Sequence, residues 1–382
     1  MPAPTIANNA LTDYQRDAWD AVQKHGSIRA AARALGKSYT PIHGAYHAAK
    51  RKMELDPAIA ESMTAVGTGL IPALAWAKTK NPDGTSYSVL LKPPVEAVQD
   101  QLESIAEAFD SLTSVAVPPP VTIDGDHMTV YPLYDMHIGM MAWGRETRGQ
   151  DFDLKLMKSD LMQSIAKVMA RSPDSGEALI ILGGDTIHVN DHFNETPASG
   201  HHQDADGRFE KIIDVAIEAI SEAIELVAQK HRSVKIVVLR GNHDETSHIV
   251  LKAALKQRYR ATDHIGFPVV PKWDKSEIFW FAFGDVLIVA HHGDKMKPER
   301  LAMIAADKCP DWSGKTCRVL LTGHIHTFKV LDMPGATHYS LRAFAPPDAY
   351  GANFGGVRGL AAMTFDKLDG LVVSAHDPIH RK

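Results

Sequence analysis

Five apolar stretches of this sequence stop abruptly at groups of His, Asp and Asn residues. Each stretch is short and rich in Val, Ile and Leu, which predicts a buried β-strand. The polar groups that follow are Asp135 and His137; Asp185 and His188; Asn242, His243 and Asp244; His291, His292 and Asp294; and His324 and His326. Because parallel strands of an open α/β sheet end at one edge, we expect these side chains to meet in a single cleft at the edge of one sheet.

Each of these strand endings has an ordinary explanation when it is taken alone. A Gly-Asp pair after a strand is commonly a turn, and an isolated His is more often a core or surface residue than a ligand. Asp244, in the stretch VVLRGNHDET, could equally cap a following helix. Five such endings in one chain nevertheless favour a shared site, because carboxylates, imidazoles and an amide are all groups that bind metals or move protons.

The mixture of nitrogen and oxygen ligands indicates which metals the site would take. It favours Mn, with Fe, Zn, Ni or Co as alternatives, over Mg or Ca, which prefer oxygen ligands alone. Two divalent ions roughly 3.5–4 Å apart need a shared carboxylate, and Asp185 could provide it. Ions of this kind activate water for attack on phosphorus. The sequence therefore predicts a phosphoesterase with two divalent metal ions.

Strands and helices alternate after Val121, which predicts an α/β layered domain over residues 121–382. Strands are expected at 128–134, 178–183, 235–240, 278–283, 286–291 and 318–322, and helices near 153–171, 207–231, 246–260 and 297–308. After Phe328 the pattern becomes hairpin-like, in KVLDM, HYSLRAF, LAAMTFD and LVVSAHD, and we expect these strands to form a second sheet. The polar segment 189–208 is too long for a simple connection, and such loops over a site usually shape substrate choice.

Residues 1–56 form a separate, basic region. A helix to Lys24, a second from Ser27 to Leu35, a turn at Gly36 and a third helix from about Thr40 to Met53 resemble the helix-turn-helix modules of DNA-binding proteins. That resemblance implies that the third helix enters the major groove. The residues implied to lie near bases are Lys37, Ser38, Tyr39, Thr40 and His43, and those implied to lie near phosphates are Lys50, Arg51 and Lys52. A small helical protein-binding domain with a solvated basic face is the alternative.

The distribution of charge is consistent with a nucleic-acid partner for this region. Residues 1–53 hold eight Lys or Arg and three Asp, a net charge of +5, whereas the whole chain is at −5 and the remainder therefore at −10. The basic end could meet DNA while the remainder attracts cations.

Residues 57–120 are expected to form a linker or arm between the two domains. It would contain a short hairpin around NPDGT, a helix from Val95 to Leu112 and a stiff spacer at Pro118–Pro120. No apolar run reaches the roughly 20 residues that span a bilayer, and the first residues lack a secretory pattern. With only two cysteines, Cys309 and Cys317, a disulfide framework is also excluded. We therefore expect a cytoplasmic protein without a membrane partner; the sequence does not decide its oligomeric state.

The motifs D-x-H, G-D, G-N-H-D, H-G and G-H-x-H, in this order and after successive strands, resemble those of the calcineurin-like metallophosphoesterases. The resemblance implies a four-layered α/β-β/α sandwich with a dimetal centre at its edge. It also implies that Asp135, His137 and His326 hold the first metal, that Asp185 bridges, and that Asn242, His292 and His324 hold the second. His292 is chosen over His291 because it directly precedes Gly293. By the same resemblance, His243 protonates the leaving oxygen and Asp244 orients it.

Two motif details bear on the substrate. The chain lacks the G-D-x-x-D-R-G and G-N-H-E of the phosphoprotein phosphatases, which makes a protein substrate a poor fit. GDTIH is instead similar to the G-D-x-x-H of the DNA-repair exonucleases of this class, which implies that His188 contacts the substrate; a partner to a metal ligand is the alternative. We therefore expect a DNA nuclease. The alternatives are an enzyme for nucleotides or other small phosphoesters, and a protein that is mainly a DNA-binding regulator.

Overall fold

The computed structural model describes residues 12–53, 75–80, 86–91, 117, 125–198, 200–268, 277–349, 351 and 356–380. The chain divides into two units, Met1–Ser104 and Ile105–Lys382, and each is described by itself. The helix expected at Val95–Leu112 and the spacer at Pro118–Pro120 lie outside the described residues. Within the described part of the chain, no helix is both long and apolar enough to cross a membrane.

The first unit contains the three helices expected from the sequence, α1 (Asp13–His25), α2 (Ile28–Ala34) and α3 (Tyr39–Met53). Thr12 begins α1 in a reciprocal capping box with Gln15, and the Ser27 side chain caps α2 by accepting a hydrogen bond from the Ala30 amide. Gly26 ends α1 in the left-handed conformation, which a glycine adopts without strain. Small apolar side chains from all three helices form the core, namely Ala18, Ala21, Val22, Ala31, Ala32, Ile42 and Ala45.

The hairpin expected in the arm is present as an antiparallel pair. Strand β1 (Ala75–Lys80) pairs with β2 (Ser86–Leu91), with Lys80 opposite Ser86 at the closed end. The turn between them, at 81–85, lies outside the described residues.

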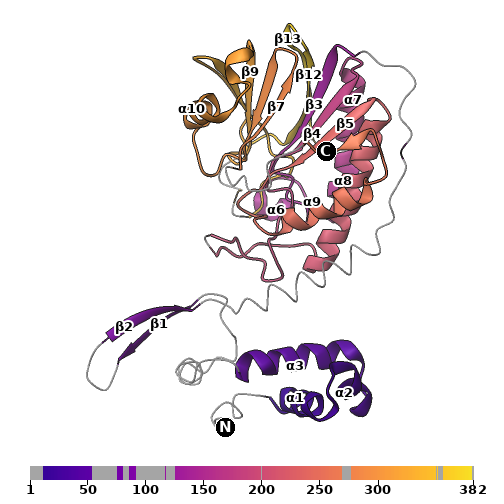
Figure 1. Cartoon of the computed structure of the whole chain (residues 1–382), viewed down its shortest axis with the longest axis vertical. Helices are drawn as coiled ribbons and strands as arrows, with labels where there is room; N and C mark the ends of the chain where they lie inside the picture. Colours follow the sequence, from indigo (N-terminus) through magenta and orange to yellow (C-terminus); the bar gives the residue numbers. More distant parts are fainter. Residues whose placement is uncertain are drawn as a thin grey trace. The chain divides into compact units, whose positions relative to one another are not determined.

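The second unit is built on two sheets (Figure 1). The six-stranded sheet has the order β13 (Gly370–Pro378), β12 (Gly359–Asp366), β3 (His127–Leu133), β4 (Glu177–Leu182), β5 (Ser233–Val238) and β6 (Ile265–Gly266). The five-stranded sheet has the order β10 (Lys329–Met333), β11 (Ala336–Ser340), β9 (Cys317–Thr322), β8 (Val286–Ala290) and β7 (Phe279–Phe283). Strands β3, β4 and β5 are parallel neighbours, and so are β8 and β9.

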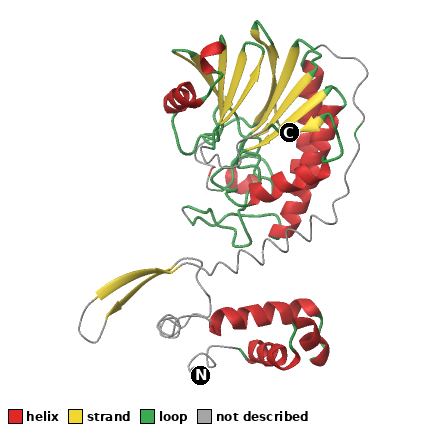
Figure 2. Cartoon of the chain, viewed as in Figure 1, coloured by secondary structure: helices red, strands yellow, loops and turns green. Residues whose placement is uncertain are grey.

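The two sheets pack face to face, with helices on their outer faces (Figure 2). On the six-stranded sheet, Tyr131, Ile180 and Ile236 pack against α7 (Leu154–Arg171), α8 (Phe209–Ala228) and α9 (Ser247–Arg258). The opposite faces of the same strands, with Val130, Leu179 and Val237, meet Ile288 and Val319 of the other sheet. On the outer face of the five-stranded sheet, Leu287 and Leu320 pack against α10 (Pro298–Lys308). The predicted four-layered α/β-β/α sandwich is confirmed.

Two expectations about the sheets were wrong. The second sheet is not made by the strands after Phe328 alone, because β7, β8 and β9 belong to it, while β12 and β13 return to the first sheet beside β3. Nor do the five ligand-bearing strands share one sheet: β3, β4 and β5 lie in one, and β8 and β9 lie in the other. The carboxyl-terminal part of each of these strands is buried on both faces, so the periodicity of its side chains does not reveal its sheet.

Candidate metal centre

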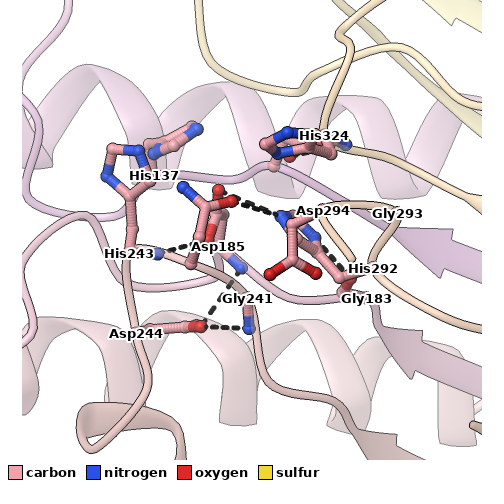
Figure 3. Close-up of polar contacts among 12 residues, drawn as sticks. His137, Gly183, Asp185, Gly241, His243, Asp244, His292, Gly293, Asp294 and His324 are labelled. Atoms are coloured by element: carbon pink, nitrogen blue, oxygen red, sulfur yellow. Dashed lines mark hydrogen bonds and ion pairs between the residues drawn. The ribbon is translucent and has the colours of Figure 1, made fainter. Parts of the chain in front are cut away.

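The carboxyl ends of the two groups of parallel strands meet at one edge of the sandwich. Nε2 of His326, after β9, lies 3.4 Å from Oδ1 of Asp135, after β3. Nε2 of His292, after β8, lies 3.2 Å from Oδ2 of Asp185, after β4. The side chains expected to share a site are thus brought together at an edge that both sheets form. Figure 3 shows Asp185, His292 and His324 at this edge, with His137 and His243 beside them.

The first cluster consists of Asp135, His137 and His326, whose ligand atoms lie within 4.8 Å of one another. The Nε2 atoms of His137 and His326 are 3.5 Å apart. The carboxylate of Asp135 is fully buried and accepts the backbone amide of His324 at 2.9 Å through Oδ2. These three residues are the ones that the resemblance assigns to the first metal.

The second cluster consists of Asp185, His292 and His324, again within 4.8 Å. Asn242 joins it, because its Oδ1 lies 3.1 Å from Nε2 of His292. The Nδ1 atom of His292 lies 3.0 Å from the carbonyl oxygen of Gly183, which directs Nε2 into the cluster. His291 is turned away, since its Nδ1 accepts the amide of Gly293 at 2.9 Å. The position of His292 agrees with its choice over His291, and the bridging role of Asp185 stays a prediction.

The backbone of these motifs is held in a conformation that non-glycine residues seldom adopt. Five of the expected ligands have positive φ angles: Asp135 (50°), His137 (46°), Asp185 (48°), His324 (67°) and His326 (54°). Each such residue costs about 1 kcal/mol or more unless its surroundings stabilise it. Strain concentrated on the residues whose side chains converge is typical of a functional site rather than of ordinary turns.

Glycines leave room for the ligands. A Cβ added to Gly241 would lie 2.1 Å from Oδ1 of Asp185, and one on Gly323 would lie 2.3 Å from Oδ2 of Asp135. A Cβ on Gly184 would lie 2.6 Å from Nδ1 of His292. The glycines of the G-D, G-N-H-D and G-H-x-H motifs are therefore needed because backbone and ligand approach too closely for any side chain.

Burial and neighbouring charges set the protonation of the cluster. Burial would raise the pKa of Asp185, but the charge of His292 and the hydrogen bond to it outweigh burial and hold that pKa well below its usual value. The same ion pair raises the pKa of His292 against the opposing effect of burial. Burial, with the nearby His243, lowers the pKa of His137 well below its usual value, and burial also lowers that of His324. His137 and His324 are thus kept neutral, with a lone pair to offer.

The donor set fits divalent metal ions. Buried carboxylates alternate with imidazoles and an amide oxygen, and two imidazole Nε2 atoms, those of His137 and His326, face each other with the carboxylate of Asp135 beside them. This set supplies the mixed nitrogen and oxygen ligands that transition metals prefer, and two of its Nε2 atoms face each other where a shared ion would satisfy both.

His243 lies beside the first cluster, but Asp244 does not orient it. The ring centroids of His243 and His137 are 4.7 Å apart. The carboxylate of Asp244 is fully buried and accepts backbone amides from Gly241 at 2.7 Å, Thr186 at 2.9 Å, and Asp185 and Ile187 at 3.3 Å. The expectation that Asp244 orients the ring of His243 is therefore corrected: Asp244 fixes the backbone that carries Asp185.

The ring of His243 is held instead by two groups that sequence reasoning missed. Its Nδ1 contacts Nε2 of Gln203 and lies 3.2 Å from the carbonyl oxygen of His188. Gln203 comes from the polar segment 189–208 and is only 5% exposed. Gln203 is one of many polar residues in this loop, and no sequence motif marks it as a site residue.

His188 lies against His137, one of the expected metal ligands. Its Nδ1 lies 3.2 Å from Nδ1 of His137, and its side chain is 1% exposed. Burial, with the nearby His243, lowers its pKa to about 3. A neutral, buried imidazole that contacts His137 matches the second of the two roles left open by the sequence, and direct contact with substrate stays a prediction.

The residues expected to contact DNA lie on or just before α3. Lys37, Ser38 and Tyr39 are exposed, and His43 is half-buried. The rings of Tyr39, His43 and His47 follow one another along one face of the helix, with centroids 5.3 and 4.3 Å apart, and Arg29 lies over Tyr39. Lys50 is half-buried; the side chains of Thr40, Arg51 and Lys52 lie outside the described ones.

No known protein family and no curated protein matches this chain in sequence. Among solved structures, it is similar to a predicted phosphoesterase from Streptococcus pneumoniae, with 10% identity over 66% of this chain and 98% of that one and a TM-score of 0.28. An archaeal phosphodiesterase matches at 12% identity over 66% of this chain and all of that one, with a TM-score of 0.33. Vps29 from Entamoeba histolytica, in complex with zinc, matches at 11% identity over 65% and 98%, with a TM-score of 0.25. Likenesses this distant do not identify a substrate.

Proposed function

We propose that this protein hydrolyses phosphoesters with two divalent metal ions, one held by each cluster. The observation that carries the proposal is the pair of carboxylate–imidazole clusters at the edge where the two sheets meet. Asp135, His137 and His326 would hold the first ion, and Asn242, His292 and His324 the second, with Asp185 shared between them. Mn is the first candidate, with Fe, Zn, Ni and Co as alternatives.

Bound divalent ions would supply a nucleophile from water near neutral pH and offset the negative charge of the phosphate. The protein supplies the rest. Asp244 fixes the loop that carries Asp185 through four backbone hydrogen bonds. His188 orients the ring of His137 through the contact between their Nδ1 atoms. His243 stands beside the first cluster, where its ring can donate a hydrogen bond to the leaving oxygen.

We propose a phosphodiester of nucleic acid as the substrate, with the three-helix unit as the part that recruits DNA. The face of α3 that carries Tyr39 and His43, with the preceding Lys37, supports this, because hydroxyl, imidazole and ammonium groups all donate hydrogen bonds to base edges or phosphates. Contact between α3 and the major groove would place these residues against the bases.

Small phosphoesters are the second candidate substrate. The net charge of −10 outside residues 1–53 favours them, since a long DNA footprint usually requires a basic stripe along the catalytic unit. The two candidates predict different products with the same metal centre.

Turnover by metal-stripped protein resupplied with Mn²⁺ tests the proposal. The substrates are a 4-nitrophenyl phosphodiester, a panel of nucleotides, and labelled single- and double-stranded DNA, with Asp185→Asn as the inactive reference. Cleavage of DNA by the wild type alone supports the nuclease. Turnover of small esters without cleavage of either DNA makes the protein an enzyme of small phosphoesters, and no turnover with any metal contradicts the proposed function.

A separate binding experiment tests the role of α3. We expect Lys37→Ala to weaken binding to duplex DNA and to lower the slope of log affinity against log salt by about 1, because one phosphate contact is lost. Lys24→Ala, at the exposed end of α1, is the matched control of equal charge. An equal loss of DNA affinity in both variants would show that the net charge of the unit attracts DNA, without a specific contact through α3.

A further inference from the structure

Gln203 is fixed in place although the segment that carries it is polar and long. Its backbone N–H donates to the backbone carbonyl oxygen of Asn194 at 2.8 Å, so the segment forms a closed turn. The residues after it are tied to the loop that follows β3: the Met141 amide donates to the carbonyl of Asp204 at 2.9 Å, and the Asp206 amide donates to that of Gly139 at 2.8 Å. The segment is thus anchored to the loop of the first motif at the point where Gln203 enters the site.

The orientation of the side-chain amide of Gln203 is determined by its neighbours. Its Nε2 lies 2.6 Å from the carbonyl oxygen of His188, and a carbonyl oxygen only accepts, so the amide nitrogen must face it. The same Nε2 contacts Nδ1 of His243. The amide oxygen, Oε1, is buried and has no hydrogen-bond partner among the described residues. Gln203 therefore acts here as a hydrogen-bond donor, through the two N–H groups of its side-chain amide, to the carbonyl oxygen of His188 and to Nδ1 of His243.

A ring nitrogen that faces an N–H donor has to be the one without a proton. The Gln203 contact therefore requires Nδ1 of His243 to accept. The carbonyl of His188, which is 3.2 Å from Nδ1, would favour the opposite tautomer, but a proton on Nδ1 would then face the N–H of Gln203, which is the nearer neighbour. The remaining nitrogen, Nε2, then carries the proton, and none of the described residues hydrogen-bonds it.

We propose that Gln203 is a positioning residue that fixes the ring of His243 with its proton on Nε2, and so makes His243 a hydrogen-bond donor to the leaving oxygen. This inference rests on the proposed function and narrows its substrates. A donor at the leaving oxygen matters most when that oxygen departs as a strong base, as the alkoxide of a sugar does; 4-nitrophenolate is a weak base and departs without a proton. Gln203 thus favours phosphodiesters of alcohols, the class to which nucleotide linkages belong.

The first test compares leaving groups. Gln203→Met keeps the length of the side chain and removes the donor; it also removes the unpaired oxygen, so we expect the fold to tolerate it. We expect its kcat/KM to fall at least about tenfold more on an alkyl phosphodiester than on the 4-nitrophenyl ester, and His243→Ala to show the same pattern. An equal loss on both esters would make Gln203 a merely structural residue and overturn the proposal. His202→Ala, the exposed neighbour in the same segment, is the matched control.

The second test asks whether Gln203 acts through His243. In the double variant on the alkyl ester, Gln203→Met should add less than about threefold to the loss caused by His243→Ala, because the residue that it positions is already gone. Independent, additive losses would contradict the inference.

The third test reads the tautomer directly and needs no turnover. Long-range ¹⁵N–¹H correlation spectra of the histidine rings, with His243 assigned from the His243→Gln spectrum, should show an unprotonated Nδ1 in the wild type and a changed pattern in Gln203→Met. A proton on Nδ1 in the wild type would overturn the role of Gln203 even if the enzyme hydrolyses phosphoesters. If the spectra show the expected tautomer but no substrate is hydrolysed, the proposed function is contradicted, while the effect of Gln203 on the His243 tautomer is supported.

Discussion

Nε2 of His292 lies 3.2 Å from Oδ2 of Asp185, and the two residues follow strands of different sheets. The ion pair between them joins β8 to β4 across the edge of the sandwich. Burial opposes both charges, and each charge stabilises the other, as their opposite pKa shifts show. A charged pair of this kind is costly in a protein interior, and a divalent ion bound at the site would take the place of the proton on Nε2 of His292.

Replacement of Asp185 by Asn should abolish binding of at least one metal ion. The amide is neutral, so it offsets the charge of a cation less well than a carboxylate does, and loss of a ligand costs more than the roughly 10- to 100-fold loss known for residues that only support ligands. We expect the affinity for Mn²⁺ to fall about 100-fold or more, measured by titration calorimetry of the metal-stripped protein. Asp307→Asn, on the exposed surface of α10, is the control and should bind as the wild type does. Unchanged stoichiometry and affinity in Asp185→Asn would remove Asp185 from the metal site.

Replacement of Asp244 should act first on stability. Its buried carboxylate accepts four backbone amides, and Asp244→Ala would leave these donors unsatisfied. We expect a loss of about 3 kcal/mol or more in the free energy of unfolding, because each unsatisfied buried donor costs about 1–3 kcal/mol. Asp244→Asn keeps an oxygen acceptor and should lose less. Urea unfolding of the metal-free variants measures both. Wild-type stability in Asp244→Ala would contradict the backbone role.

The strands, the helices and the polar residues at the strand ends could be predicted from the sequence because they are local. Runs of Val, Ile and Leu bounded by Gly and polar residues mark strands, and the polar residues at their ends are visible in the same few positions. The pairing of strands into sheets could not be predicted in this way. Strand β12 contributes Leu360 and Ala362 to the core beneath the helices, and Met363 and Phe365 to the core between the sheets, so its apolar pattern is the same in either sheet.

The hydrogen-bond partners of His243 and Asp244 also could not be predicted from the sequence. Adjacent residues of one tetrapeptide were expected to work together, yet the side chain of Asp244 is directed to the backbone of residues 185–187, and His243 is held by Gln203, 40 residues away. Contacts of this kind depend on where a long loop returns, and loop geometry is not encoded in a periodic pattern.

The close approach of Gly241 to Asp185 predicts that this glycine tolerates no side chain. In Gly241→Ala, a Cβ would lie 2.1 Å from Oδ1 and 2.2 Å from the amide nitrogen of Asp185. Relief of the clash must shift Asp185, so we expect a loss of about 1–3 kcal/mol in stability together with weakened Mn²⁺ binding. Gly314→Ala, where a Cβ would meet nothing within 4 Å, is the matched control and should change stability by less than about 0.5 kcal/mol. Normal metal binding by Gly241→Ala would show that the loop adjusts without moving the ligand.

A buried histidine just before the start of β5 predicts how stability depends on pH. His231 is fully buried, with Nε2 2.8 Å from the hydroxyl of Tyr131 and Nδ1 3.0 Å from that of Ser175. Burial lowers its pKa to about 4, against about 6.5 when unfolded. Between these values the unfolded chain binds the extra proton and the folded protein does not, so the unfolding free energy falls as the pH falls.

The contribution of His231 should therefore be complete above about pH 6.5 and lost at about pH 4, a change of about 3 kcal/mol. The measurement is the urea midpoint of the metal-free protein from pH 7 to pH 4, compared with that of His231→Gln, which has no group to titrate there. The ligand histidines titrate in both proteins, so the difference between the two curves isolates His231. Because Gln removes a buried partner of Tyr131, the variant is expected to be less stable at pH 7 and to approach the wild type toward pH 4. Parallel curves would mean that His231 binds its proton equally well in the folded and unfolded chain.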